Sequence, residues 1–88
     1  MEYTDSQISL LRKMYYDGVI GARHQGEREV CRGFPKHLKS GIKNELKKLR
    51  KDGLVRIKKA GYGDQYSLEP TAIPRIIEIL EKVDDNSD

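Results

Sequence analysis

Residues 53–70 constrain the fold of this chain most, because two alternating runs flank a glycine-containing turn. In the first run, "LVRIKK", Val55 and Ile57 alternate with charged residues; in the second, "QYSLE", Tyr66 and Leu68 alternate with polar ones. A period of two is typical of strands that bury one face. The connection "AGYGD" carries two glycines, which supply the positive backbone angles of a hairpin turn. The segment therefore predicts a half-buried antiparallel hairpin.

A long basic helix is predicted just before the hairpin, over residues 35–53. Proline is common at the first helical position and glycine just past the last, so "PKHLKSGIKNELKKLRKDG" has suitable ends. Its apolar residues recur at steps of four, four and three and form one narrow stripe: Leu38, Ile42, Leu46 and Leu49. Gly41 lies in mid-helix, where glycine costs about 1 kcal/mol relative to alanine. We interpret it as allowing close packing against the preceding helix, or the close approach of another molecule.

The N-terminal region is predicted to form one helix and a connector. The helix covers residues 5–17, and Asp5 or Ser6 can accept hydrogen bonds from its first backbone N–H groups. Gly18 is expected to end it, because glycine adopts the left-handed conformation found after helices. In the connector, residues 19–26, the pair "VI" is a candidate for a short strand.

Two more helices complete the predicted fold. The first, "EREVCRGF", is short and breaks at Gly33; the second, "TAIPRIIEILEKV", has Thr71 as its cap and tolerates Pro74 only in its first turn. The aliphatic residues of the second form another stripe: Ile73, Ile76, Ile77, Leu80 and Val83. The order of elements predicts an α+β, mainly helical domain, in which a three-helix core carries a two- or three-stranded sheet and an extra C-terminal helix.

Length and composition favour one domain, which we place at residues 1–83, with a disordered polar tail at residues 84–88. No apolar run approaches the roughly 20 residues of a membrane span. The N-terminus also lacks the pattern of a signal peptide. A single cysteine, Cys31, excludes an intramolecular disulfide. We therefore expect a cytoplasmic protein without membrane contact.

Positive charge is concentrated in the middle of the chain. Residues 35–63 carry ten Lys/Arg against two acids, a net charge of +8, whereas residues 1–34 are neutral and residues 64–88 have a net charge of −5. A basic block between a neutral head and an acidic tail indicates a directional surface for a polyanion. A solvated lysine-rich helix would give the same count.

The chain contains no recognisable catalytic or metal-binding pattern. His24, Cys31 and His37 are metal-ligand types, but six and five residues separate them, and zinc sites favour close pairs. Cys31, next to Val30, is interpreted as a small core residue rather than a nucleophile. The glycines of the turn lack the spacing of a phosphate-binding loop. We expect a binding protein without metal or cofactor, and not an enzyme.

The run "GFPKHLKSGIKNELKKLRKDGLVRIKKAGYGDQYSLEP" resembles the small winged helix-turn-helix proteins of archaea. "LRKDGLV" is similar to the junction between the long helix and the wing, and "YGDQYSLEP" to the return strand of the wing. The resemblance covers about residues 5–70. It implies a winged-helix fold, in which the long helix enters the major groove of DNA and the wing contacts an adjacent groove or the backbone.

This resemblance implies a DNA-binding surface opposite the apolar stripe of the long helix. On that side lie Lys36, His37, Lys39, Ser40, Lys43, Asn44 and Lys47. Asn44 is the candidate for base readout, since its amide can pair with adenine, and the lysines are candidates for phosphate contacts. In the wing, Lys58 and Lys59 would add counterion release, and Tyr62 would contact a sugar or a phosphate. The alternative for Tyr62 is a side chain folded back onto the core.

The function expected from these residues is binding of double-stranded DNA by a small transcriptional regulator or chromatin-associated factor. Winged helices also bind RNA and proteins, so an RNA-binding domain and a protein–protein interaction module remain alternatives. The apolar stripe of the last helix has two interpretations: it covers the core, or it pairs with the same helix of a second copy in a homodimer.

Overall fold

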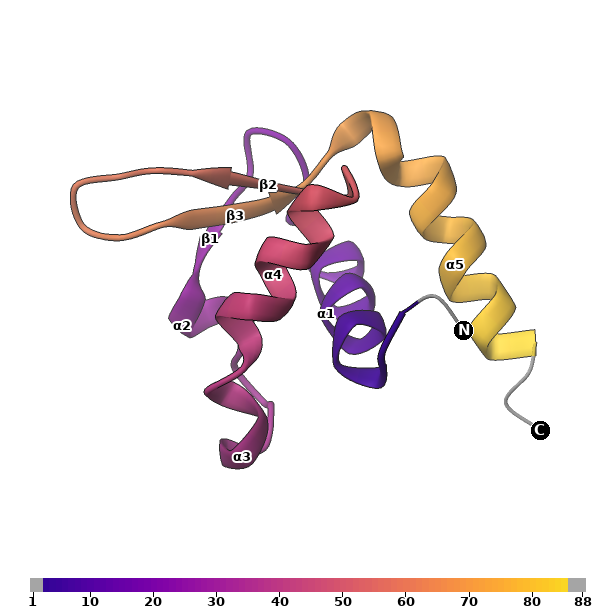
Figure 1. Cartoon of the computed structure of the whole chain (residues 1–88). Helices are drawn as coiled ribbons and strands as arrows, with labels where there is room; N and C mark the ends of the chain where they lie inside the picture. The colour runs from indigo at the N-terminus through magenta and orange to yellow at the C-terminus, as the bar shows by residue number, and fades with distance from the viewer. Residues whose placement is uncertain (1–2, 86–88) are drawn as a thin grey trace.

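The structure, a computed structural model, describes residues 3–85 and has the α+β, mainly helical architecture expected from the sequence (Figure 1). In chain order the elements are α1 (Asp5–Tyr16), β1 (Gln25–Gly26), α2 (Glu27–Val30), α3 (Lys36–Lys39), α4 (Ile42–Lys51), β2 (Val55–Lys58), β3 (Gln65–Leu68), the 3₁₀ helix η1 (Pro70–Ala72) and α5 (Ile73–Asp85). Within this range, no helix is both long and apolar enough to cross a membrane.

The predicted hairpin is confirmed, and a third strand joins it. β2 pairs antiparallel with β3, with Val55 opposite Leu68, and β1 adds to the other edge of β3, with Gln25 opposite Tyr66. The strand order is therefore β1-β3-β2. The candidate strand at "VI" is reduced to one parallel bridge between Ile20 and Leu68; the strand of the connector lies instead at Gln25–Gly26.

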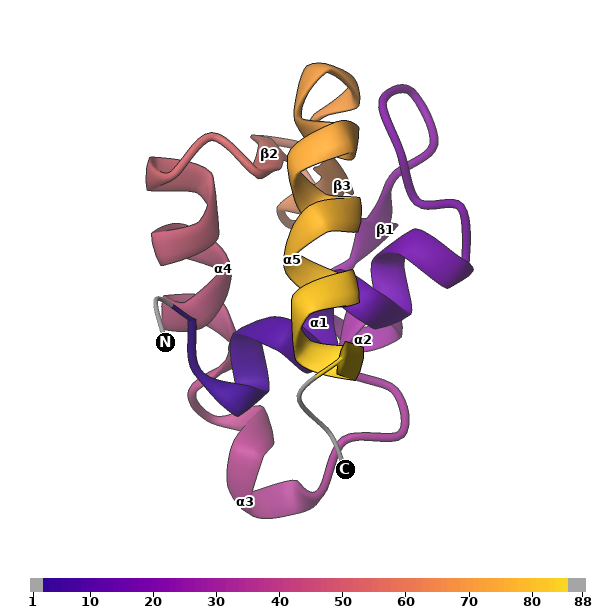
Figure 2. The same cartoon turned by 90° about the vertical axis from the view of Figure 1, so that its right-hand side faces the viewer.

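The core lies between α1, α4, α5 and one face of the sheet. The middle and last parts of the predicted helix stripe are confirmed, because Ile42, Leu46 and Leu49 of α4 are fully buried. From β3, Tyr66 and Leu68 pack into the same cluster. α5 packs across α1 on the side away from the hairpin tip, as Figure 1 and Figure 2 show. The basic side of α4 is left facing solvent.

The single helix predicted over residues 35–53 is wrong, because the chain interrupts it at Ser40 and Gly41 and forms α3 and α4. Leu38 does not belong to the core cluster or to the residues packed against it, so α3 has little apolar contact to hold it in line with α4. The interpretation of Gly41 as a point of close packing against the preceding helix is also wrong, whereas the close approach of another molecule stays a prediction. A Cβ atom built there meets only the Leu38 carbonyl oxygen, at an ordinary 3.8 Å.

The cap of α1 is Thr4 and not Asp5 or Ser6. The Thr4 hydroxyl accepts from the Gln7 backbone N–H at 3.2 Å, and the Gln7 side chain accepts from the Thr4 N–H at 3.0 Å. This reciprocal capping box satisfies two N–H groups that an uncapped helix would leave without partners. Gly18 ends the helix as predicted, with a φ of 70°.

The two remaining helices differ from their predictions at the ends. α2 stops at Val30, three residues before Gly33. Thr71 does not cap α5, because it lies inside η1 and donates to the Glu69 carboxylate at 3.1 Å. Pro74 falls in the first turn of α5, as required. η1 runs directly into α5, so the start of α5 is not a free helix end that needs a side-chain cap.

α5 uses most of its predicted apolar stripe for the core. Ile76 and Leu80 are buried, and Ile73 and Val83 pack against the cluster, whereas Ile77 does not. Ile79 packs against the cluster instead. Of the predicted polar tail, residues 84 and 85 belong to α5, and residues 86–88 lie outside the described part of the chain.

Candidate nucleic-acid interface

Seven of the ten candidate site residues belong to the α3–α4 segment. Lys36, His37, Lys39, Ser40, Lys43, Asn44 and Lys47 are all exposed. In the described part of the chain, the four lysines of this group form no ion pair, whereas Lys48 lies 3.6 Å from Glu45 on another side of α4. Cations without partners keep their charge available to an external anion.

The hairpin carries the other three candidate residues. Lys58 ends β2 and is exposed; Lys59 follows it and lies 3.3 Å from the Asp64 carboxylate. Tyr62 is 83% exposed, which excludes the alternative that it folds back onto the core. Gly63 has a φ of 131°, a conformation that side chains rarely adopt, so the turn depends on glycine at this position.

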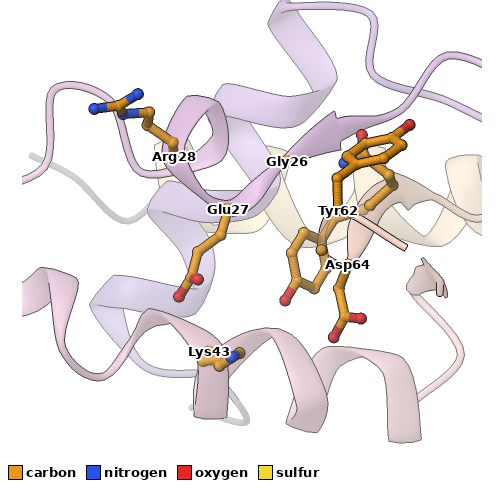
Figure 3. Close-up of a pocket in the computed structure, with 9 residues that line it drawn as sticks. Gly26, Glu27, Arg28, Lys43, Tyr62 and Asp64 are labelled. Carbon is orange, nitrogen blue, oxygen red and sulfur yellow. The ribbon is translucent and has the colours of Figure 1, made fainter. Parts of the chain in front are cut away.

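The structure brings the middle of the basic segment together with the hairpin tip. Lys43 of α4 and Tyr62 of the tip line the same pocket, of about 290 Å³ (Figure 3). α3 lies apart from this region: Figure 1 and Figure 2 place it at the end of α4 opposite the start of β2. The candidate residues therefore form two groups, one around the pocket and one on α3.

The pocket also contains residues that the sequence did not single out. Its lining includes Glu27 and Arg28 from the start of α2, Asp64 from the turn before β3, and Gln65 and Tyr66 from β3. Pairing of β1 with β3 brings the start of α2 beside the hairpin, and this pairing joins residues about forty positions apart. A two-residue strand has no detectable alternation, so no local pattern could have indicated it.

Two carboxylates act on the phenol of Tyr66 in this pocket. Burial raises the pKa of Tyr66 above its ordinary value of 10.0, and the negative charges of Asp64 and Glu27 raise this pKa further. The phenol therefore remains protonated throughout the physiological pH range. Its hydroxyl can donate one hydrogen bond as well as accept.

The three metal-ligand residue types lie in separate places. His24 Nδ1 is 3.2 Å from Gln65 Oε1, at the edge of the sheet. The Cys31 thiol donates to the Arg28 carbonyl oxygen at 3.8 Å and is partly buried against the core, as the sequence suggested. His37 is exposed on α3.

Comparison with protein-family models, curated proteins and solved structures gave no match for this chain.

Proposed function

We propose that this protein binds double-stranded DNA in the manner of a winged helix-turn-helix domain. In this assignment α4 is the helix that enters the major groove, and the turn between β2 and β3 is the wing. The order of helices and strands and the strand order β1-β3-β2 support it. The role that fits so small a domain is that of a transcriptional regulator or a chromatin-associated factor.

The observation that carries the proposal is the set of unpaired, exposed lysines along α3, α4 and β2. Lys43 and Lys47 lie on α4 away from its buried stripe, and Lys58 lies on β2 beside the tip. Each lysine that neutralises a phosphate releases a condensed counterion, so the affinity of such a surface depends strongly on salt. Asn44, exposed between Lys43 and Lys47, is the residue assigned to base readout.

The proposal is tested by neutralising two of these cations together. The double variant Lys43→Ala/Lys47→Ala should bind duplexes of any sequence more weakly and reduce the slope of log K against log salt by roughly two. The matched control is Arg12→Ala/Lys82→Ala, which also removes two charges but from α1 and α5. Both control residues belong to exposed ion pairs, at 2.8 Å and 4.0 Å, that contribute little to stability.

Fluorescence anisotropy with random duplexes over a range of salt concentrations measures both slopes. Equal slopes for the two double variants would refute the assignment of α4. Stronger competition by RNA than by DNA would indicate the RNA-binding alternative. Failure to bind either nucleic acid at low salt would favour a protein partner. Asn44→Ala should lower the preference for one base and leave affinity for random duplexes nearly unchanged.

A homodimer through α5 is the second part of the proposal. Ile77 supports it, because this aliphatic residue of α5 lies outside the group packed on the core. Light scattering after size-exclusion chromatography, with Ile77→Lys as the variant, tests the dimer. A monomeric mass for the unmodified protein at the highest concentration would refute it.

A further inference from the structure

The pocket between α2, α4 and the hairpin is lined by two carboxylates as well as by the basic residues Arg28 and Lys43. Glu27 comes from the start of α2 and Asp64 from the turn before β3. In Figure 3 the carboxylates of Glu27 and Asp64 both extend toward α4, Glu27 above Lys43, while Arg28 points away from that side. Phosphate binding does not explain two carboxylates at this position, because they would repel it.

Tyr66 adds a third polar group to this pocket. Only 1% of this residue is exposed, and it lines the same pocket. The hydroxyl is the only polar atom of its side chain, and no residue of the described chain forms a hydrogen bond with it. Burial raises the pKa of this hydroxyl, and the negative charges of Asp64 and Glu27 raise it further. The hydroxyl is open to the pocket and has no partner within the described chain, so it is available to an external one.

The carboxylates are available to such a partner at small cost. In residues 3–85, the Glu27 side chain forms no ion pair or hydrogen bond. Asp64 has Lys59 at 3.3 Å, but the Lys59 side chain is 83% exposed, and pairs of this kind contribute little. Lys43 also lines the pocket, yet no carboxylate of residues 3–84 lies within ion-pair distance of it. Among the lining side chains, those of Glu27, Asp64 and Tyr66 can therefore accept hydrogen bonds from a ligand, and Lys43 places an ammonium group at the α4 side.

We propose that this pocket binds an ammonium or guanidinium group, held by the carboxylates of Glu27 and Asp64 and by the hydroxyl of Tyr66. A group rich in donors can bind all three oxygen-bearing groups together, which neither a carboxylate nor a phosphate does. The volume of about 290 Å³ suits a small organic cation or the end of one side chain. The exposed ring of Tyr62, at the rim, is available for a cation–π contact. This site goes beyond DNA binding and does not depend on it.

The experiment is a titration of the ¹⁵N-labelled full chain, followed by amide chemical shifts. The probes are agmatine, a free cation with a guanidinium and an ammonium end, and a capped Gly-Arg-Gly peptide, which represents an arginine of a protein partner. We expect saturable shifts at residues 26–28 and 62–66. Tighter binding of agmatine would identify a free metabolite as the source, and equal or tighter binding of the peptide would identify a protein side chain.

Two conservative variants and one matched control make the test specific. Glu27→Gln and Asp64→Asn should each weaken the probe that binds by about fivefold, the upper range for an ion pair near the surface. Glu29→Gln removes the same charge from α2, but Glu29 is exposed and does not line the pocket, so the affinity should not change.

Absence of saturable binding of both probes at millimolar concentration would overturn the proposal. Chemical-shift changes confined to the acidic residues of α5 would also overturn it. So would an equal loss of affinity in Glu29→Gln and Glu27→Gln, because either result indicates unspecific attraction between charges. The amide spectrum of each variant shows directly that it is folded.

Discussion

The substitution Gly41→Ala tests whether the interruption between α3 and α4 is a weak point of an otherwise helical segment. Gly41 has φ −95° and ψ −6°, and Ser40 has φ −65° and ψ −25°, so both residues are near the helical region. The Gly41 N–H reaches the Leu38 carbonyl at 3.2 Å, and the Glu45 N–H reaches the Gly41 carbonyl at 3.1 Å. The backbone thus continues through the junction with only a local distortion.

Two opposing effects decide the sign of this substitution. Glycine is preferred over alanine at N-caps, but an N-cap residue has extended backbone angles, which Gly41 does not have. The helix-interior preference therefore applies, and it favours alanine by up to about 1 kcal/mol. The new Cβ meets only the Leu38 carbonyl oxygen at 3.8 Å, without strain. We expect a gain of roughly 0.5–1 kcal/mol in the free energy of unfolding, or about 2–8 °C in Tm.

Thermal unfolding followed by circular dichroism at the helical band measures the effect. Gly53→Ala is the matched control, because a Cβ at Gly53 also has open space around it but φ is +80° there. Alanine is strained in this conformation, so the control should lower Tm by several degrees. A loss of stability in Gly41→Ala similar to that of the control would refute the reasoning, since it would mean that the junction requires glycine.

Two further predictions concern α1 and β3. Thr4→Ala removes the cap of α1 and the 2.8 Å hydrogen bond from the Thr4 hydroxyl to Glu45, and should cost about 1 kcal/mol in urea unfolding. Thr4→Ser keeps the hydroxyl and should retain most of this stability. Equal losses of unfolding free energy in Thr4→Ala and Thr4→Ser would contradict the capping role. Tyr66 has a higher pKa in the folded state, so above the ordinary value of 10.0 the unfolded chain releases this proton first and stability falls as pH rises. Tyr66→Phe should remove the part of the stability loss above pH 10 that comes from this group, with little change in stability at neutral pH. A pH dependence of stability unchanged by Tyr66→Phe would contradict this prediction.

Most of the secondary structure could be predicted because its causes lie within a few residues. Alternation at Val55 and Ile57 gave the hairpin, and the spacing of Ile42, Leu46 and Leu49 gave the buried side of α4. The exposure of Lys43, Asn44 and Lys47 follows from the same periodicity, because residues opposite a buried stripe face solvent. These features need no knowledge of which element packs where.

The interruption at Gly41 depends on packing. The sequence extends its apolar stripe to Leu38, and a helix covering both residues is consistent with that pattern. Whether the Leu38 side chain is buried depends on how the other helices pack around it. The core cluster stops short of Leu38, so the first turn separates from α4.

The sequence alone determined the helical type of α1, α4 and α5, the β2–β3 hairpin, the basic side of α4 and the glycine-dependent turn, since local periodicity and backbone preference specify them. Only the tertiary structure decided which distant residues meet. The two-residue strand β1 places Glu27 beside Asp64 and Tyr66, across about forty residues of chain. The position of so short a strand depends on its partner in the sheet and not on its own residues, which is why the pocket could not be foreseen.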